Sequence, residues 1–171
     1  MQQRSRTGRP KRPLSCHDRA LRLLASRPRS RRELETRLRS AGFDREIVAE
    51  ELARLEEVGL LDDERFAREF AEHSLGRKLS GRRAVASSLA AKGVARPMIE
   101  RALQDVEVDE DARADELARA RASRLQGLAP EVAYRRLVSF LARRGYQGTV
   151  ARRAAASALR PQTGAEGPSE A

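Results

Sequence analysis

The chain has 171 residues, of which 40% are apolar and only 4% aromatic, and it has no tryptophan. Its core must therefore be built mostly of Leu, Ala and Val. The formal net charge of +10 predicts an anionic partner, with nucleic acid first. One cysteine excludes an internal disulfide framework, and no stretch has the length and apolar character of a membrane span or a signal peptide. We expect an all-α, cytoplasmic protein with no membrane partner.

Three helices are predicted in the first part of the chain. The first spans residues 18–26, the second follows its cap Ser30, and the third lies between its cap Asp44 and the terminator Gly59. Glu33 stands at the capping-box spacing from Ser30. The helical spacing of apolar residues predicts inward faces made by Ala20, Leu21, Leu24, Leu34, Leu38, Ile47, Val48, Leu52 and Leu55.

The stretch Val58 to Phe70, VGLLDDERFAREF, is predicted to join two helical units. Its two adjacent leucines, Leu60 and Leu61, are apolar residues inside a connection, so we expect both to fold back onto a core. Asp62 or Asp63 can cap the helix that follows. Phe66 and Phe70 are four residues apart and fall on one face of that helix.

The second part of the chain repeats the plan, and the third part repeats it again. Helices are predicted over residues 63–75, 80–92 and 96–105, with Pro97 at the start of the last. An acidic run over 107–111 opens a longer helix to about residue 126. A helix from Pro130 ends at Gly145, and a final one reaches about residue 159.

One junction recurs three times: a Leu, three residues, a Gly, and then a large apolar residue. The glycines are Gly42, Gly93 and Gly145, which are 51 and 52 residues apart by subtraction. A constant period with three helices each time predicts a repeat architecture, whose units stack into an elongated molecule that can curve. The predicted organisation is a disordered basic tail over 1–13, helical repeats over 14–61, 62–106 and 107–160, and a disordered tail over 161–171.

Arginine pairs follow the repeat. They stand nine to eleven residues before the repeat glycine, and they are Arg31–Arg32, Arg82–Arg83 and Arg135–Arg136, with Arg143–Arg144 added in the third repeat. If the units stack regularly, these residues line one side and can track a nucleic-acid backbone or a long polymeric partner. A solvated helix face is the alternative for any one pair.

The sequence contains no constellation typical of catalysis or cofactor binding. His17 and His73 are not spaced with cysteine or carboxylate clusters as metal ligands are, and Cys16 has no base at a readable spacing. The acidic run lacks the glycine and the final Glu of a calcium loop, and there is no phosphate-binding glycine loop. We therefore expect no enzyme, no cofactor and no metal.

These residues resemble the RecX family, regulators of the bacterial recombinase RecA. The resemblance covers about residues 14–159, and its most specific part is the LLDD-R-FA stretch, with Asp62, Arg65 and Phe66, for which a structural role is expected. The other matching residues are Ala20 to Leu24, Arg29–Ser30, Glu33–Leu34, Leu38, Gly42–Phe43, Gly59 to Leu61, Lys92 to Val94 and Arg143 to Tyr146.

The resemblance implies tandem three-helix repeats and binding to the RecA filament on single-stranded DNA, and we expect the protein to be a monomer. It also implies that binding limits ATP hydrolysis and strand exchange, and so regulates DNA repair, homologous recombination and the SOS response. Two alternatives remain: a DNA-binding regulator of helix-turn-helix type, and a passive helical scaffold. The helix over 45–57 carries five glutamates, which argues against its use as a recognition helix. The charge argues against a scaffold.

Overall fold

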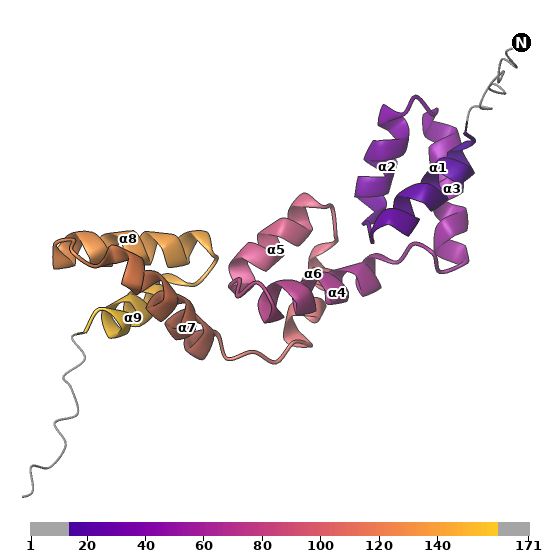
Figure 1. The fold of residues 1–171 in the computed structure, drawn as a ribbon. Coiled ribbons are helices and arrows are strands. Elements are labelled where there is room, and N and C mark those ends of the chain that lie inside the picture. Colours follow the sequence, from indigo (N-terminus) through magenta and orange to yellow (C-terminus); the bar gives the residue numbers. More distant parts are fainter. Residues whose placement is uncertain (1–13, 161–171) are drawn as a thin grey trace, which may run out of the picture. The chain divides into compact units, whose positions relative to one another are not determined.

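The computed structural model describes residues 14–160, so the two predicted tails, 1–13 and 161–171, lie outside the described residues. Within this range the fold is all-α, as predicted (Figure 1), and no helix is long and apolar enough to cross a membrane. The chain divides into two compact units with a boundary between Asp63 and Glu64. The helices are α1 (Cys16–Ser26), α2 (Arg31–Ser40), α3 (Arg45–Glu57), α4 (Asp63–Gly76), α5 (Arg82–Ala91), α6 (Arg96–Gln104), α7 (Glu110–Ala122), α8 (Pro130–Arg143) and α9 (Gly148–Ala158), with a short 3₁₀ helix over Ser123–Leu125.

The first unit packs α1, α2 and α3 around a small aliphatic core. The Ser15 hydroxyl accepts a hydrogen bond from the Asp18 amide at the start of α1, and the Ser30 hydroxyl accepts one from the Glu33 amide at the start of α2. Both serines thereby satisfy amides that the first turn of a helix leaves without a partner. The buried residues are Cys16, Ala20, Leu34, Leu38, Val48, Leu52, Leu55 and Leu61.

Two expectations for apolar residues of the first unit are wrong. Ile47 is 47% exposed because it lies at the edge of the α3 stripe, whereas Val48 beside it is buried. Of the two connecting leucines, Leu61 folds onto the core and is 3% exposed, but Leu60 is 51% exposed. Their amides both donate to the Leu55 carbonyl, so the chain reverses there and the two side chains leave in different directions.

All three repeat glycines close a helix in the same way. Each has φ between 82° and 92°, in the left-handed region where a side chain is unfavourable. After α2, the Gly42 amide donates to the Arg39 carbonyl and the Phe43 amide to the Leu38 carbonyl, which is the Schellman pattern. The same two bonds recur at Gly93 and Gly145, so the predicted junctions are confirmed as helix ends.

The second unit holds the remaining two repeats, and each has its own core. The core of α4, α5 and α6 contains Phe66 and the aliphatic residues around it, and the Phe66 and Phe70 rings lie 6.1 Å apart, centroid to centroid. The core of α7, α8 and α9 is made largely of alanine and leucine, with Tyr146 as its buried aromatic residue. Small side chains allow α7 and α9 to approach closely.

These two repeats meet at a tight junction between the start of α5 and the turn after α8 (Figure 1). The Gly81 amide donates to the Arg144 carbonyl at 2.8 Å, and the Tyr146 hydroxyl donates to the Leu79 carbonyl at 3.0 Å. A Cβ on Gly81 would overlap the backbone of Gly145 and lie 2.7 Å from the Tyr146 nitrogen. The contact is therefore backbone on backbone, and glycine is required for it.

Candidate functional site

The first arginines of two predicted pairs serve the fold of their own repeat. Arg31 begins α2, and its Nε lies 2.9 Å from Glu56 Oε1 near the end of α3. Arg82 begins α5, and its guanidinium donates to the Leu103 carbonyl and, at 3.0 Å, to the Val106 carbonyl at the end of α6. Both side chains are half-buried. In the first and second repeats, this arginine therefore connects the second helix to the end of the third.

The backbone amides of the same two arginines are capped by acids from further along the chain. The Arg31 amide donates to Asp63 Oδ1 at 2.7 Å, and the Arg82 amide donates to Glu110 Oε1 at 2.8 Å. Asp62 or Asp63 was expected to cap the helix that follows them, and the Asp63 carboxylate is engaged elsewhere, at the N-terminus of α2. Burial raises the pKa of Asp63, and the hydrogen bond from Arg31 opposes this rise.

The second arginine of each of these pairs is directed to solvent. Arg32 and Arg83 are exposed, and neither side chain forms an ion pair with any residue between 14 and 160. They stand ten residues before their repeat glycine, and Arg135 occupies the same position in the third repeat. The third pair differs locally, because Arg135 and Arg136 lie within α8 rather than at its start, and both are exposed.

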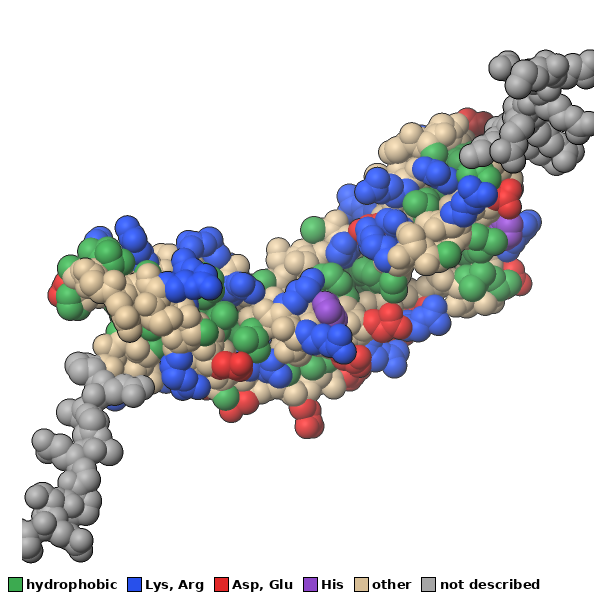
Figure 2. All heavy atoms as spheres, in the orientation of Figure 1, with side chains coloured by type: hydrophobic (Ala, Val, Ile, Leu, Met, Phe, Trp, Pro, Cys, Tyr) green, Lys and Arg blue, Asp and Glu red, His purple; other side chains and the backbone are tan. Residues whose placement is uncertain are grey.

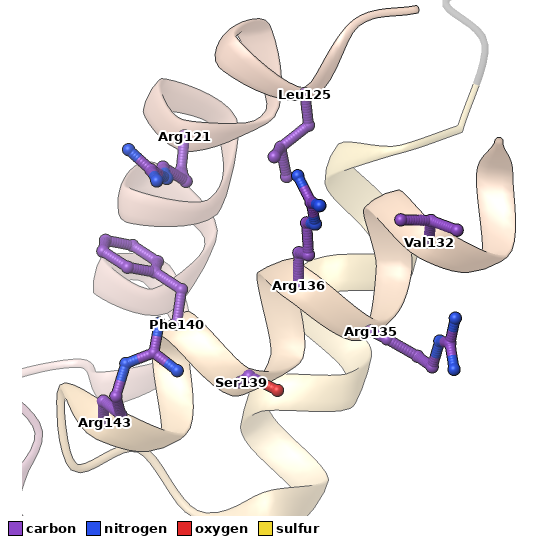
Figure 3. A pocket seen from close by; sticks show the side chains of 8 residues that line it. All are labelled: Arg121, Leu125, Val132, Arg135, Arg136, Ser139, Phe140 and Arg143. Atoms are coloured by element: carbon purple, nitrogen blue, oxygen red, sulfur yellow. The ribbon is translucent and has the colours of Figure 1, made fainter. Parts of the chain in front are cut away.

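The third repeat has a hollow of about 490 Å³ along α7 and α8 (Figure 3). Its lining combines four arginines with apolar side chains, and none of the lining residues is acidic. They are Arg121, Leu125, Val132, Arg135, Arg136, Ser139, Phe140 and Arg143. In the space-filling view, Lys and Arg side chains gather over α8 (Figure 2).

Phe140 organises the cations around the hollow. The Arg121 guanidinium carbon lies 5.2 Å from the centroid of its ring, and that of Arg144 lies 5.5 Å from it. These are cation–π distances, so the ring holds both guanidinium groups without neutralising their charge. Arg144 also donates to the Lys78 carbonyl at 3.2 Å and thus contributes to the junction between the second and third repeats.

The three signature residues of the central stretch have different surroundings. Phe66 is buried in the core of the second repeat, while Asp62 and Arg65 are exposed. One contact of the first unit has no signal in the sequence: His17 Nδ1 lies 2.8 Å from Oε1 of the buried Glu51. Across residues 14–160 no cluster of three His, Cys, Asp or Glu side chains could hold a metal ion.

The fold and the surface together define a class: a protein of tandem three-helix repeats whose exposed cations recur with the repeat and gather on the third. Three consecutive segments match the three-helix domains of RecX in order. Residues 16–55 match the first domain, 62–103 the second and 109–155 the third. The chain belongs to the RecX family of regulatory proteins.

Similar proteins cover most of this chain. It is 44% identical over 137 residues to the regulatory protein RecX of Mycolicibacterium smegmatis, an alignment that covers 77% of this chain and 72% of the relative. It is 37% identical to RecX of Chlorobaculum tepidum, covering 77% and 81% of the two chains. The crystal structure of RecX from Lactobacillus salivarius shares the fold, with a TM-score of 0.70 at 19% identity over 84% of this chain and 94% of that one.

Proposed function

We propose that this protein binds the RecA filament on single-stranded DNA and limits recombinase activity, ATP hydrolysis and strand exchange, in the cytoplasm. The observation that carries the proposal is the ordered match of all three RecX domains between residues 16 and 155. Through RecA, the protein would regulate DNA repair and the SOS response. No catalytic step and no cofactor is assigned to the chain, and it would act as a monomer.

Exposed arginines supply the contacts to the filament in this proposal. One stands at the same position of every repeat, namely Arg32, Arg83 and Arg135, and Arg136, Arg143 and Arg144 add to the third. Several weak contacts made at once by linked repeats gain avidity, because the second and third contacts become intramolecular. Arg31 and Arg82 contribute through the fold, since their side chains are engaged within their own repeats.

The test is the single-stranded-DNA-dependent ATPase of RecA, with this protein titrated from far below the recombinase concentration. We expect inhibition at substoichiometric amounts, and a filter-binding control must show that the DNA has not been sequestered. Replacing Arg32 and Arg83 by Glu should weaken inhibition while the circular dichroism spectrum stays helical. Inhibition that requires saturation of the DNA would favour a plain DNA-binding regulator and would refute action on the filament.

A further inference from the structure

We propose that the hollow of the third repeat binds the sugar–phosphate backbone of single-stranded nucleic acid, with Arg121, Arg135, Arg136 and Arg143 as its cationic contacts. This deepens the proposed function, and it rests on that function for the choice of a single strand. It assigns direct contact with the nucleic acid to one repeat and to named residues.

The first argument is the absence of internal neutralisation. Arg135, Arg136 and Arg143 are exposed and form no hydrogen bond or ion pair through their side chains with any residue from 14 to 160. The Arg121 guanidinium lies over the Phe140 ring and has no ion pair with any residue from 14 to 160. Four like charges around one hollow repel each other, and this repulsion is relieved when a polyanion binds. The site therefore has a standing electrostatic preference for a ligand with several negative charges.

The second argument is the linear arrangement of the charges. Arg136 and Arg143 are seven residues apart on one face of α8, which corresponds to about 10 Å along the helix axis. Figure 3 shows Arg143 beside Phe140 at one end of the hollow and Arg135 beside Val132 at the other, with Arg136 between them. Charges spread along a line match a chain of phosphates better than they match one compact anion.

The third argument is the mixed character of the lining. Leu125, Val132 and Phe140 provide apolar surface between the cations. Single-strand binding surfaces combine a cationic track with apolar or aromatic surface, because an unpaired strand presents base faces as well as phosphates. Guanidinium planes can also stack on bases, and the Phe140 ring holds that of Arg121 in place. A duplex would offer only its phosphates here.

The fourth argument is that the hollow is a departure from the repeat, not a consequence of it. Counted back from the repeat glycine, the positions of Arg136, Phe140 and Arg143 carry different residues in the other two repeats. They are Glu33, Arg37 and Ser40 in the first repeat and Ala84, Ser88 and Ala91 in the second. Among the arginines of α8 that line the hollow, only Arg135 stands at a position that carries arginine in all three repeats. The core does not use the side chains of Arg136 and Arg143, since both are exposed, whereas Phe140 lines the hollow and also packs against the core of the third repeat.

The experiment measures fluorescence anisotropy of a fluorescein-labelled oligothymidylate with the full chain, over a range of salt concentrations. The variant is Arg136→Gln with Arg143→Gln. The matched control is Arg68→Gln with Arg152→Gln, two exposed arginines of the same unit that lie outside the hollow and form no ion pair within residues 14–160. Both variants lose two charges from exposed helix positions, so melting curves should match that of the wild type.

Two lost phosphate contacts should make the slope of log K against log salt shallower by about 1.4. If the variant and the wild type bind equally at 1 M salt, the variant should then bind about 25-fold more weakly at 0.1 M salt. The control should change affinity by less than about threefold. An equal loss in both variants would mean that net charge alone governs binding and would overturn the proposal. No measurable binding by the wild type at low salt would overturn it as well.

The RecA ATPase separates this inference from the proposed function. If the Arg136→Gln, Arg143→Gln variant binds oligothymidylate like the wild type but no longer inhibits RecA, the hollow takes an acidic protein segment and the inference is refuted. If the wild type binds the oligonucleotide through the hollow but leaves RecA unaffected, the inference stands and the proposed function fails.

Discussion

Replacing Arg82 by Met should destabilise the second repeat, whereas the same replacement at Arg83 should not. The two residues are adjacent on α5, carry the same charge, and differ in what their side chains contact. Arg82 donates two hydrogen bonds to the carbonyl groups of Leu103 and Val106, while Arg83 is exposed and has no ion pair within residues 14–160. Met keeps the length and the helix propensity of the side chain, so only the guanidinium is lost.

The expected loss follows from the two hydrogen bonds. A typical intramolecular hydrogen bond contributes about 1 kcal/mol net, and one from a charged group contributes more when it is buried. Arg82 is only half-buried, so we take the lower figure for each bond and expect about 2 kcal/mol in total. Exposed Arg83 should stay within about 0.5 kcal/mol of the wild type.

Urea unfolding followed by circular dichroism at 222 nm measures both variants. With a slope of about 2 kcal/mol per molar urea, the Arg82→Met midpoint should fall by about 1 M. Repeat proteins need not unfold in one step, so amide hydrogen exchange should also localise the loss to peptides from α5 and α6. Equal midpoints for the two variants would refute the structural role of Arg82. Reduced RecA inhibition by Arg83→Met, with full stability, would complete the contrast.

Three further outcomes are expected. Gly81→Ala should cost more than about 2 kcal/mol, because its Cβ would overlap backbone atoms of the facing turn, whereas Gly76→Ala meets nothing within 4 Å and should be near neutral in urea unfolding. Burial raises the pKa of Tyr146, so in a Tyr134→Phe variant the remaining phenol should ionise above pH 10, as followed at 295 nm. The stabilisation linked to this neutral phenol is present below the pKa of about 10 that it has in the unfolded chain, and it is lost as pH rises through the pKa of the folded state. A titration midpoint of the phenol at or below pH 10 would contradict its burial. Burial and the carboxylate of Glu51 raise the pKa of the Cys16 thiol, so this thiol should react slowly with a disulfide reagent until urea unfolds the chain. A fast reaction in the native state would contradict its buried position.

The repeat glycines show how far the sequence determines this fold. A glycine that follows a leucine by four residues and precedes an apolar residue specifies a helix end by local geometry alone, and all three predicted ends are present. The helix bounds are close to those expected for the same reason. Burial of an apolar side chain is not a local property, and this explains Ile47 and Leu60. Periodicity assigns Ile47 to an apolar helix face, and the apolar character of the connection predicts burial of Leu60, but neither pattern reveals how much of the side chain the neighbouring helices cover.

The roles of the paired arginines could not be predicted from the sequence because their partners are remote in it. Arg31 contacts Glu56, and Arg82 contacts Val106, so each needs the third helix of its repeat to be in place. The residues that line the hollow could also be predicted only in part from the sequence. Arg135, Arg136 and Arg143 were candidates from their pairing, but Arg121 belongs to no pair of adjacent arginines, and only the packing of α7 beside α8 brings it to Phe140.

The recurrence of arginine along this chain therefore has two separate causes. At the position eleven residues before the repeat glycine, Arg31 and Arg82 recur because the fold of each repeat uses a guanidinium to join two of its helices. The third repeat has Tyr134 there, inside a longer helix that begins earlier. Ten residues before the glycine, arginine is present in all three repeats with its charge exposed.

Exposed charges contribute little one at a time, since a single surface ion pair is worth at most about 1 kcal/mol. A partner that itself repeats can engage one such charge per repeat, and the overall affinity then exceeds that of any single contact because the contacts are linked. A partner that is a continuous polyanion is better served by several charges in one place. In the proposals made above, Arg32, Arg83 and Arg135 would meet the first requirement, with one arginine in each repeat, and the hollow on α7 and α8 would meet the second. A filament of repeated protein subunits wrapped on one DNA strand has both properties, which is why the two sets of arginines are compatible with a single function.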